Sequence, residues 1–209
     1  RSDNAVGALC QLDALLLGMQ AMPLVEIIAV LLSASAVWLT VRQNLWCWPL
    51  WLVSVLMYAW VFFGVRLYSD MLLQLVYAVL QLYGWWQWAR GGAQHSGRQV
   101  SRLPGNQLLA SLLAGAAGGL LLGYLMATYT DASAPWLDAA LTSFSLVAQV
   151  WMAQKRLECW PLWIVLDVIY VGLFLSKDLY LTAVLYAVFT ALAVAGWRAW
   201  PRSPGMVTR

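Results

Sequence analysis

Seven apolar stretches of membrane-spanning length are the strongest constraint that this sequence places on its fold. A transmembrane helix needs about 20 mostly apolar residues, within a range of about 17 to 25. Most of the connections between the stretches are only a few residues long, so they leave no room for a soluble domain. The sequence therefore predicts an all-α polytopic membrane protein. The predicted spans are residues 23–41, 46–65, 71–89, 107–127, 136–154, 159–175 and 179–197.

The composition argues against the main classes of soluble protein. Of the 209 residues, 63% are hydrophobic and 10% are charged, whereas soluble domains are about 45 to 50% apolar and about 25% charged. So few charged side chains cannot cover the surface of a soluble domain of this size. The formal net charge of +3 comes from scattered residues without a basic stripe, which argues against nucleic-acid binding.

The basic residues predict the orientation in the membrane, because cytoplasmic loops carry an excess of lysine and arginine. Nine of these residues fall on one side of the predicted spans and three on the other. We therefore expect the N-terminus outside and the C-terminus in the cytoplasm. The richer side receives Arg42, Arg90, Arg98, Arg102, Lys155, Arg156, Arg198, Arg202 and Arg209, and the other receives Arg1, Arg66 and Lys177.

The sequence contains an internal repeat with a constant, ungapped offset. The segment CWPLW at residues 47–51 recurs at residues 159–163. The spacing is 159 − 47 = 112 residues, and we call it the repeat offset. Spans one to three thus correspond to spans five to seven, and the fourth span joins them. The fifth span follows the first by four membrane crossings, an even number, so both repeats enter the membrane from the same side. This predicts a 3+1+3 arrangement of parallel repeats with a substrate site between them, as in some carriers; a purely structural duplication is the alternative.

The repeat also divides the chain into segments. We predict an N-terminal segment at 1–22 with an interfacial helix, a first three-helix repeat at 23–91 and a second at 135–203. Residues 92–134 form a loop and the linking helix, and residues 204–209 form a tail. The chain begins with arginine and shows no secretory signal, so we expect a trimmed or tagged N-terminus.

Four residues of the sixth span form one polar and aromatic helix face. Trp160, Trp163, Asp167 and Tyr170 fall at i, i+3, i+7 and i+10. An acid facing lipid would cost about 2.5 to 3.5 kcal/mol or more, so Asp167 should face the bundle interior. A carboxylate beside aromatic faces can bind a cation. An aromatic belt at the membrane interface is the alternative for the tryptophans.

Further candidate ligands lie on the second and third spans. Gln74 and Gln81 are mid-span amides of the third span, with interhelical hydrogen bonding as the alternative role. At the repeat offset, Asp167 corresponds to Val55, Gln74 to Tyr186 and Gln81 to Ala193. An asymmetric ligand on a pseudo-twofold axis needs such unlike residues. The complete predicted substrate-binding set is Trp160, Trp163, Asp167, Tyr170, Gln74, Gln81, Trp51 and Tyr58.

Cofactor, metal and catalytic chemistry lack their usual residues. Cys10, Cys47 and Cys159 form no CxxC pair and imply no disulfide framework. The single histidine, His95, lies in a loop rich in glycine, serine and arginine. Asp167 has no second carboxylate at its depth, so we expect no enzyme and no cofactor.

Over residues 23–200 the sequence resembles the PnuC family of bacterial vitamin-precursor transporters. The resemblance is carried by LLQ at 72–74, YGWWQW at 83–88 and RLECWPLWIVLD at 156–167, which contains WxxWxxx(N/D) after a basic loop. It implies facilitated diffusion of a vitamin or nucleoside-like compound across the inner membrane, with a cytoplasmic kinase that traps the product. It also implies a homotrimer, and substrate contacts by Trp160, Trp163, Asp167 and Gln74.

One departure from the family pattern bears on the substrate. Asp167 stands where nicotinamide riboside carriers have asparagine, and Gln81 stands where an asparagine is often found. An asparagine amide donates and accepts hydrogen bonds, whereas an ionised aspartate only accepts. Thiamine offers an aminopyrimidine donor and a permanent positive charge, so this argument favours thiamine, with nicotinamide riboside as the alternative. A membrane receptor that binds the ligand without moving it is a remoter alternative.

Overall fold

The computed structural model describes residues 28, 30–64, 68–92, 95–130, 134–176 and 180–202. Within these ranges the regular structure is helical, apart from an isolated bridge between Ser101 and Arg156. The predicted segments 1–22 and 204–209 lie outside the described residues. The helices are a first helix that includes Val30–Val41, α2 (Cys47–Gly64), α3 (Tyr68–Arg90), α4 (Gly105–Tyr129), α5 (Pro135–Ala153), α6 (Cys159–Ser176), α7 (Tyr180–Ala199) and the 3₁₀ turn η1 (Trp200–Arg202).

The helix ends within the described residues agree closely with the predicted spans, and the predicted start of the first span at residue 23 lies outside them. The largest difference is at the start of α3, predicted at Met71 and observed at Tyr68. Among the described residues, Gly105–Tyr129, Cys159–Ser176 and Thr182–Arg202 are long and apolar enough to cross a membrane. α3 and α5 have the length but carry more polar side chains, among them the buried Gln81 and Gln149.

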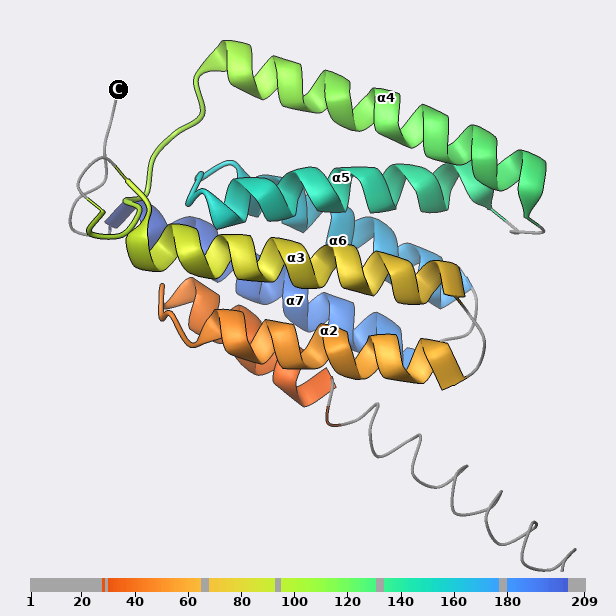
Figure 1. Ribbon diagram of the computed structural model, residues 1–209, viewed down its shortest axis with the longest axis horizontal. Coiled ribbons are helices and arrows are strands. Elements are labelled where there is room, and N and C mark those ends of the chain that lie inside the picture. Colours follow the sequence, from red (N-terminus) through yellow and green to blue (C-terminus); the bar gives the residue numbers. More distant parts are fainter. Residues whose placement is uncertain are drawn as a thin grey trace, which may run out of the picture.

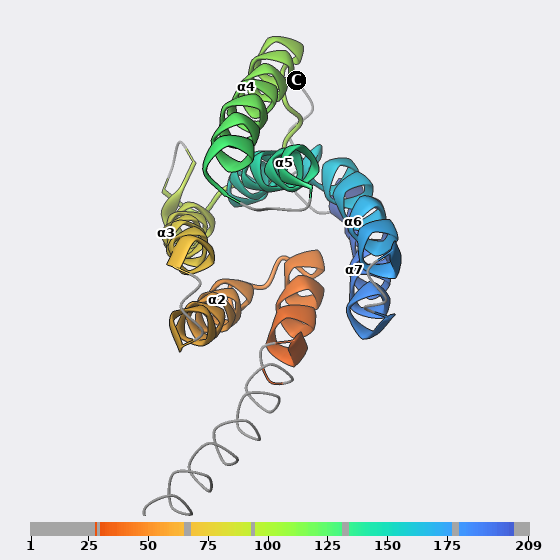
Figure 2. The ribbon, with the colours of Figure 1, turned by 90° about the vertical axis from the view of Figure 1, so that its right-hand side faces the viewer.

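The long helices lie side by side along one direction (Figure 1). α2 packs against α3, α6 against α7, and α4 against α5. Since α5 also contacts α3 and α6, it connects the two other helix pairs. The view along the helices shows α4 on the outside of the bundle, over α5 (Figure 2).

Glycines bring α4 close to α5. Gly115, Gly119 and Gly123 are the buried residues of α4 and are spaced four apart, so they share one helix face. The Ser143 hydroxyl of α5 donates to the Gly115 carbonyl at 2.8 Å. Small residues allow such close approach of helix backbones in membranes. The other face of α4 exposes leucines such as Leu113, which suits contact with lipid.

Two tryptophan–glycine contacts recur at the repeat offset. A Cβ atom added to Gly84 of α3 would overlap the indole of Trp48, and one added to Gly196 of α7 would overlap the indole of Trp160. Both indoles are 1% exposed, so neither has free space beside it. Each of these positions therefore requires a glycine.

The turns before α2 and α6 also share one geometry. Gln43 and Lys155, which correspond at the repeat offset, adopt left-handed φ angles of 54° and 50°. In each turn the next amide bonds to a carbonyl five positions back, which is typical of a Schellman motif. These bonds run from Asn44 to Leu39 at 2.9 Å and from Arg156 to Trp151 at 2.8 Å.

The loop after α3 is attached to the α5–α6 turn. The Ser101 amide donates to the Lys155 carbonyl at 3.1 Å, and the Leu157 amide donates to the Ser101 carbonyl at 3.0 Å. The Glu158 carboxylate accepts from the Leu103 amide at 2.9 Å. We call this end of the bundle, where α3, α5 and α7 finish and α2 and α6 begin, the basic end. Its described basic residues are Arg42, Arg90, Arg98, Arg102, Lys155, Arg156, Arg198 and Arg202.

We predict that Gly84→Ala and Gly196→Ala each lower the stability of the protein. The added methyl group would push a buried indole out of place, and such overpacking costs about 1 to 3 kcal/mol. Gly172→Ala in α6 is the matched control, because no atom lies within 4 Å of its added Cβ. Thermal unfolding in detergent measures the effect. Equal unfolding temperatures for all three variants would contradict the prediction.

Candidate substrate site

α6 carries the polar and aromatic face that the sequence predicts. The helix begins at Cys159, which places Pro161 in the first turn, where a missing amide hydrogen does no harm. Asp167 follows about two turns later and is only 5% exposed. No side chain in the described part of the chain donates a hydrogen bond to this carboxyl group. A buried acid of this kind in a membrane protein is a candidate for a functional site.

Asp167 interacts with Tyr170 and Tyr186, and phenol groups from two further helices lie near Tyr186. Tyr186 of α7 interacts electrostatically with Asp167, Tyr170, Tyr77 and Tyr58. Its ring centroid lies 4.9 Å from that of Tyr170 on α6. These contacts bring groups from α2, α3, α6 and α7 together. With Ser145 of α5, which lies beside Tyr77 and Tyr170, we define the phenol–carboxyl cluster as Tyr58, Tyr77, Ser145, Asp167, Tyr170 and Tyr186.

The chemistry of this cluster suits a hydroxyl-bearing cation. Phenol and serine hydroxyls both donate and accept hydrogen bonds, and an ionised carboxylate accepts them. The aromatic faces and the carboxylate of Asp167 attract positive charge. Phe174 extends the aromatic surface, with its ring 5.1 Å from that of Tyr186. A small heteroaromatic cation with several hydroxyl groups would satisfy these groups together.

The two predicted glutamines lie in different surroundings. Gln74 is half-buried and lies one helical turn before Tyr77 of the cluster, so the two share a face of α3. Gln81 is 3% exposed and its side-chain oxygen accepts a hydrogen bond from Gln149 of α5 at 3.2 Å. Gln81 therefore has an interhelical partner, whereas Gln74 lies beside the cluster.

The predicted tryptophans lie nearer the basic end than the phenol–carboxyl cluster. Trp160 is 1% exposed and meets Trp200 edge-to-face at 5.0 Å. Trp51 and Trp163 pack against the same apolar core as Trp160. Trp163 also packs on the core of Leu141 and its neighbours, and its buried indole nitrogen has no hydrogen-bond acceptor. Of the three, Trp163 thus links the tryptophan core to the helix face of Asp167.

The substrate-binding set predicted from the sequence omits three residues of the cluster. Tyr77 and Ser145 stand on polar helix faces beside predicted residues, but their types alone do not distinguish packing from binding. Tyr186 stands at the repeat position of Gln74. Polar side chains at one repeat position in both halves are a signal that could have identified Tyr186, because repeat partners that face the bundle interior both point toward the pseudo-twofold axis.

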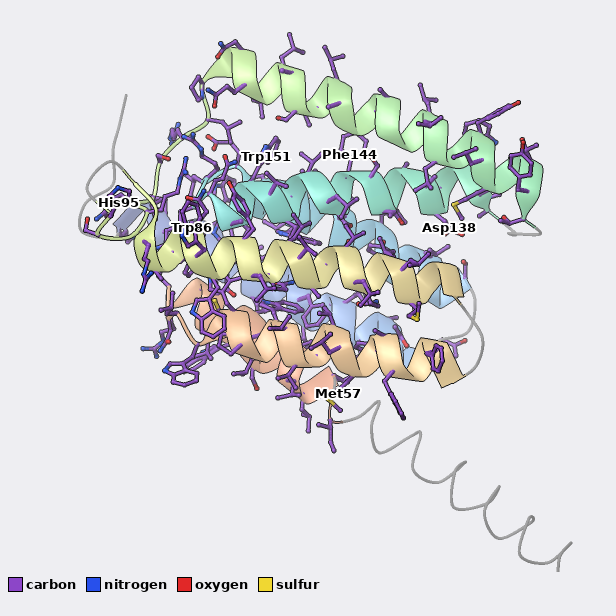
Figure 3. All side chains as sticks on the ribbon, viewed as in Figure 1. Met57, Trp86, His95, Asp138, Phe144 and Trp151 are labelled. Atoms are coloured by element: carbon purple, nitrogen blue, oxygen red, sulfur yellow. The ribbon has the colours of Figure 1, made fainter. Side chains whose placement is uncertain are left out.

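Two further titratable side chains are not members of the cluster, although Asp138 interacts electrostatically with Tyr170. His95 is exposed in the loop at the basic end, and Asp138 lies in the first turn of α5 near the other end of the bundle (Figure 3). No group of three histidine, cysteine or acidic residues among the described residues could hold a metal ion. The cluster around Asp167 is therefore the candidate site.

Comparisons with known proteins agree on a family of carriers. Residues 23–202 match the family profile described as nicotinamide mononucleotide transporter. The chain is 26% identical to the nicotinamide riboside transporter PnuC of Escherichia coli, over 73% of this chain and 74% of the relative. It is 30% identical to the riboflavin/roseoflavin transporter RibM of Streptomyces davaonensis, over 76% of each chain.

A solved structure shares the fold. The crystal structure of the vitamin B3 transporter PnuC superimposes with a TM-score of 0.68 and 22% sequence identity. The superposition covers 92% of this chain and 86% of that one. The helical arrangement described above is thus that of a known membrane carrier.

We predict that Gln81 stabilises the bundle by its hydrogen bond with Gln149 and does not contact a ligand. Gln81→Leu and Gln149→Leu should each lower stability by roughly 0.6 kcal/mol, the average for such interhelical bonds, because each leaves the other amide unpaired. The double variant should lose less than the sum of the two. Unfolding in detergent and ligand titration measure these effects. A fall in ligand affinity for Gln81→Leu but not for Gln149→Leu would instead make Gln81 a ligand contact.

Proposed function

Because the chain belongs to the PnuC family of nicotinamide mononucleotide transporters, we propose that it carries a small vitamin precursor by facilitated diffusion. As a member of this family it is a multi-pass protein of the bacterial inner membrane. The observation that carries the proposal is the buried Asp167 beside Tyr170 and Tyr186, with phenols of α2 and α3 close to Tyr186. A buried carboxylate of this kind needs a partner, and a cationic substrate supplies one.

Nicotinamide riboside is the substrate that we propose first, ahead of the thiamine favoured by the sequence argument. That argument relied on the acceptor character and the negative charge of Asp167, which suit either cation. The phenols and Ser145 of the cluster offer hydrogen bonds to the several ribose hydroxyls of nicotinamide riboside, whereas thiamine carries a single hydroxyl group on its side chain. The relatives also support this order, since one is named for nicotinamide riboside and another for riboflavin.

The transport mechanism that we propose is rocking of two parallel three-helix halves about the site. The first helix, α2 and α3 form one half, α5 to α7 form the other, and α4 links them in a 3+1+3 order. The contacts of Trp48 and Trp160, which recur at the repeat offset, support this division. The halves are related by a pseudo-twofold axis along the membrane normal, with the basic end in the cytoplasm.

Partners of the carrier follow from the same proposal. A uniporter only equilibrates its substrate, so net uptake requires a cytoplasmic kinase that phosphorylates the product. We also propose that the chain forms the homotrimer that the family resemblance implies. The exposed leucine face of α4 is then shared between lipid and neighbouring subunits.

Two other functions make different demands on the site. An enzyme that uses two acids would need a second carboxyl group facing Asp167, whereas Asp138 lies in the first turn of α5 and interacts with Tyr170. A receptor would bind the vitamin but would not exchange it across the membrane. Transport measurements therefore separate the carrier from the receptor.

The test is counterflow of labelled nicotinamide riboside in proteoliposomes without ATP or a kinase. We expect labelled substrate to exchange and free substrate to reach the external concentration but not to exceed it. Binding without exchange would support the receptor. Accumulation that a protonophore abolishes would overturn uniport and would indicate proton coupling. No binding of nicotinamide riboside, with binding of thiamine or riboflavin, would reassign the substrate.

We predict that Asp167→Asn weakens the binding of nicotinamide riboside by at least about tenfold, or about 1.4 kcal/mol. The substitution keeps the volume of the side chain but removes the charge that balances the cation. Neutral riboflavin should be affected less, and Glu158→Gln is the control for loss of an acid elsewhere on the bundle, because this carboxylate lies at the basic end and accepts from the Leu103 amide. Calorimetric titration of the purified variants measures these affinities. Equal losses for the charged and neutral ligands would contradict a charge-balancing role.

A further inference from the structure

Four buried indoles form a continuous chain across the basic end. Trp48 meets Trp88 at 5.3 Å between ring centroids, Trp88 meets Trp200 at 5.9 Å, and Trp200 meets Trp160 at 5.0 Å. All three contacts are edge-to-face, and each indole is at most 5% exposed. At the repeat offset, Trp48 corresponds to Trp160 and Trp88 to Trp200. Exchanging the two halves turns this row of four indoles end for end and leaves its contacts unchanged. The row, which we call the tryptophan chain, therefore crosses the proposed pseudo-twofold axis.

Two hydrogen bonds tie the halves together beside this tryptophan chain. The indole nitrogen of Trp88 donates to the Met152 carbonyl at 3.1 Å, and that of Trp200 donates to the Thr40 carbonyl at 3.3 Å. Thr40 and Met152 also correspond at the repeat offset. In each bond the last helix of one half, or the turn after it, holds the end of the first helix of the other half. The two bonds are therefore crossed and equivalent.

A third contact lies on the axis itself. Lys155 donates to the side-chain oxygen of Gln43, its own repeat partner, at 3.4 Å. The Lys155 ammonium also lies 4.5 Å from the ring centroid of Trp88, a cation–π distance. Burial lowers the pKa of Lys155 from its usual range, and the nearby Cys47 opposes this shift. A residue can contact its repeat partner only near the pseudo-twofold axis, so Gln43 and Lys155 mark the centre of the contacts between the two halves at the basic end.

Few hydrogen bonds hold the two halves together at the basic end, and some buried polar groups there have no partner. The buried indole nitrogens of Trp48 and Trp160 have no hydrogen-bond partner. An unpaired buried donor costs free energy, and water would satisfy both donors if the halves separated. The crossed bonds of Trp88 and Trp200 oppose that separation. A balance of this kind suits a contact that must break and re-form.

We propose that the tryptophan chain, the two crossed indole–carbonyl bonds and the Gln43–Lys155 contact form the gate at the basic end of the carrier. The gate is closed in this structure. Asp167 lies about two helical turns after Trp160, which places the candidate site about 10 Å deeper along α6. Opening separates Trp88 from Trp200 and gives the site access to that side of the membrane. This inference rests on the proposed carrier function and adds the residues that control one of its two openings.

Two native cysteines report on the state of this gate. Cys47 and Cys159 are free thiols with 0% exposure at the starts of α2 and α6. In a Cys10→Ser background, we would measure the rate at which a hydrophilic maleimide labels them in purified protein. Trp88→Phe and Trp200→Phe each remove one crossed bond. Each should raise the labelling rate by about three- to tenfold, the factor expected for the loss of one hydrogen bond.

Trp85→Phe and Trp197→Phe are the matched controls. They are also repeat partners, on α3 and α7, but their indoles are 37% and 48% exposed. Labelling should stay at the parental rate in both. Unchanged labelling in folded Trp88→Phe and Trp200→Phe, or an equal rise in the controls, would overturn the gate. Because labelling needs no substrate, this result is independent of whether the parent protein transports a vitamin.

A crosslink tests the same gate if the tryptophan variants do not fold. Gln43→Cys and Lys155→Cys, in a background without native cysteines, place two thiols across the axis. A short reducible thiol crosslinker should stop nicotinamide riboside counterflow while leaving its binding intact, and reductant should restore the exchange. Counterflow as fast in the linked protein as in the reduced protein would overturn the proposal. Absence of counterflow in the parent protein would instead reject the carrier function.

Discussion

A polar side chain inside a bilayer finds its partners within the protein, and this constraint organises the bundle. Hydrocarbon offers no hydrogen bonds, so polar groups turn toward neighbouring helices. Gln81 pairs with Gln149 between α3 and α5, and the hydroxyls of Ser33 and Ser54 lie 2.8 Å apart between the first helix and α2. Asp167 departs from this pattern, because no described side chain donates to it, and so do the buried indole nitrogens of Trp48, Trp160 and Trp163. The buried acid of the bundle interior is thus the side chain that an external ligand could pair with.

The positions of the helices could be predicted from the sequence because spanning length is set by the membrane. The site was predictable only in part. Asp167, Tyr170 and Tyr58 lie together as the helix face and the repeat suggest. Trp160 shares that face in sequence, yet its ring packs on Gly196 and Trp200. Residue spacing defines a direction around the helix axis, but it does not define depth or the side chains of other helices that fill the space.

Tyr186 shows the opposite limitation. Nothing in the pattern of α7 distinguishes this tyrosine from the other aromatic residues of the bundle, because its role depends on contacts with α2, α3 and α6. Such contacts join residues far apart in the sequence and are not encoded in any single helix. The repeat offers the missing information, since it pairs Tyr186 with Gln74. The unlike polar residues Gln74 and Tyr186 at one repeat position suit an asymmetric ligand bound between the halves.

Matched and unmatched repeat positions occur in both regions of the proposed carrier. The four tryptophans that close the basic end are two identical repeat pairs, because the same indole contact must form on each side of the axis. In the phenol–carboxyl cluster Tyr58 and Tyr170 are also repeat partners, and the asymmetry that an asymmetric substrate requires comes from Asp167 and Tyr186, whose partners are Val55 and Gln74. Trp163 packs against both the tryptophan core and the core around Leu141, so it connects the two regions along α6. A ligand shifts a conformational equilibrium only through its different affinities for the two states. Contact between substrate and Trp163 would supply such a difference, since a movement of α6 that separates the halves also moves this indole.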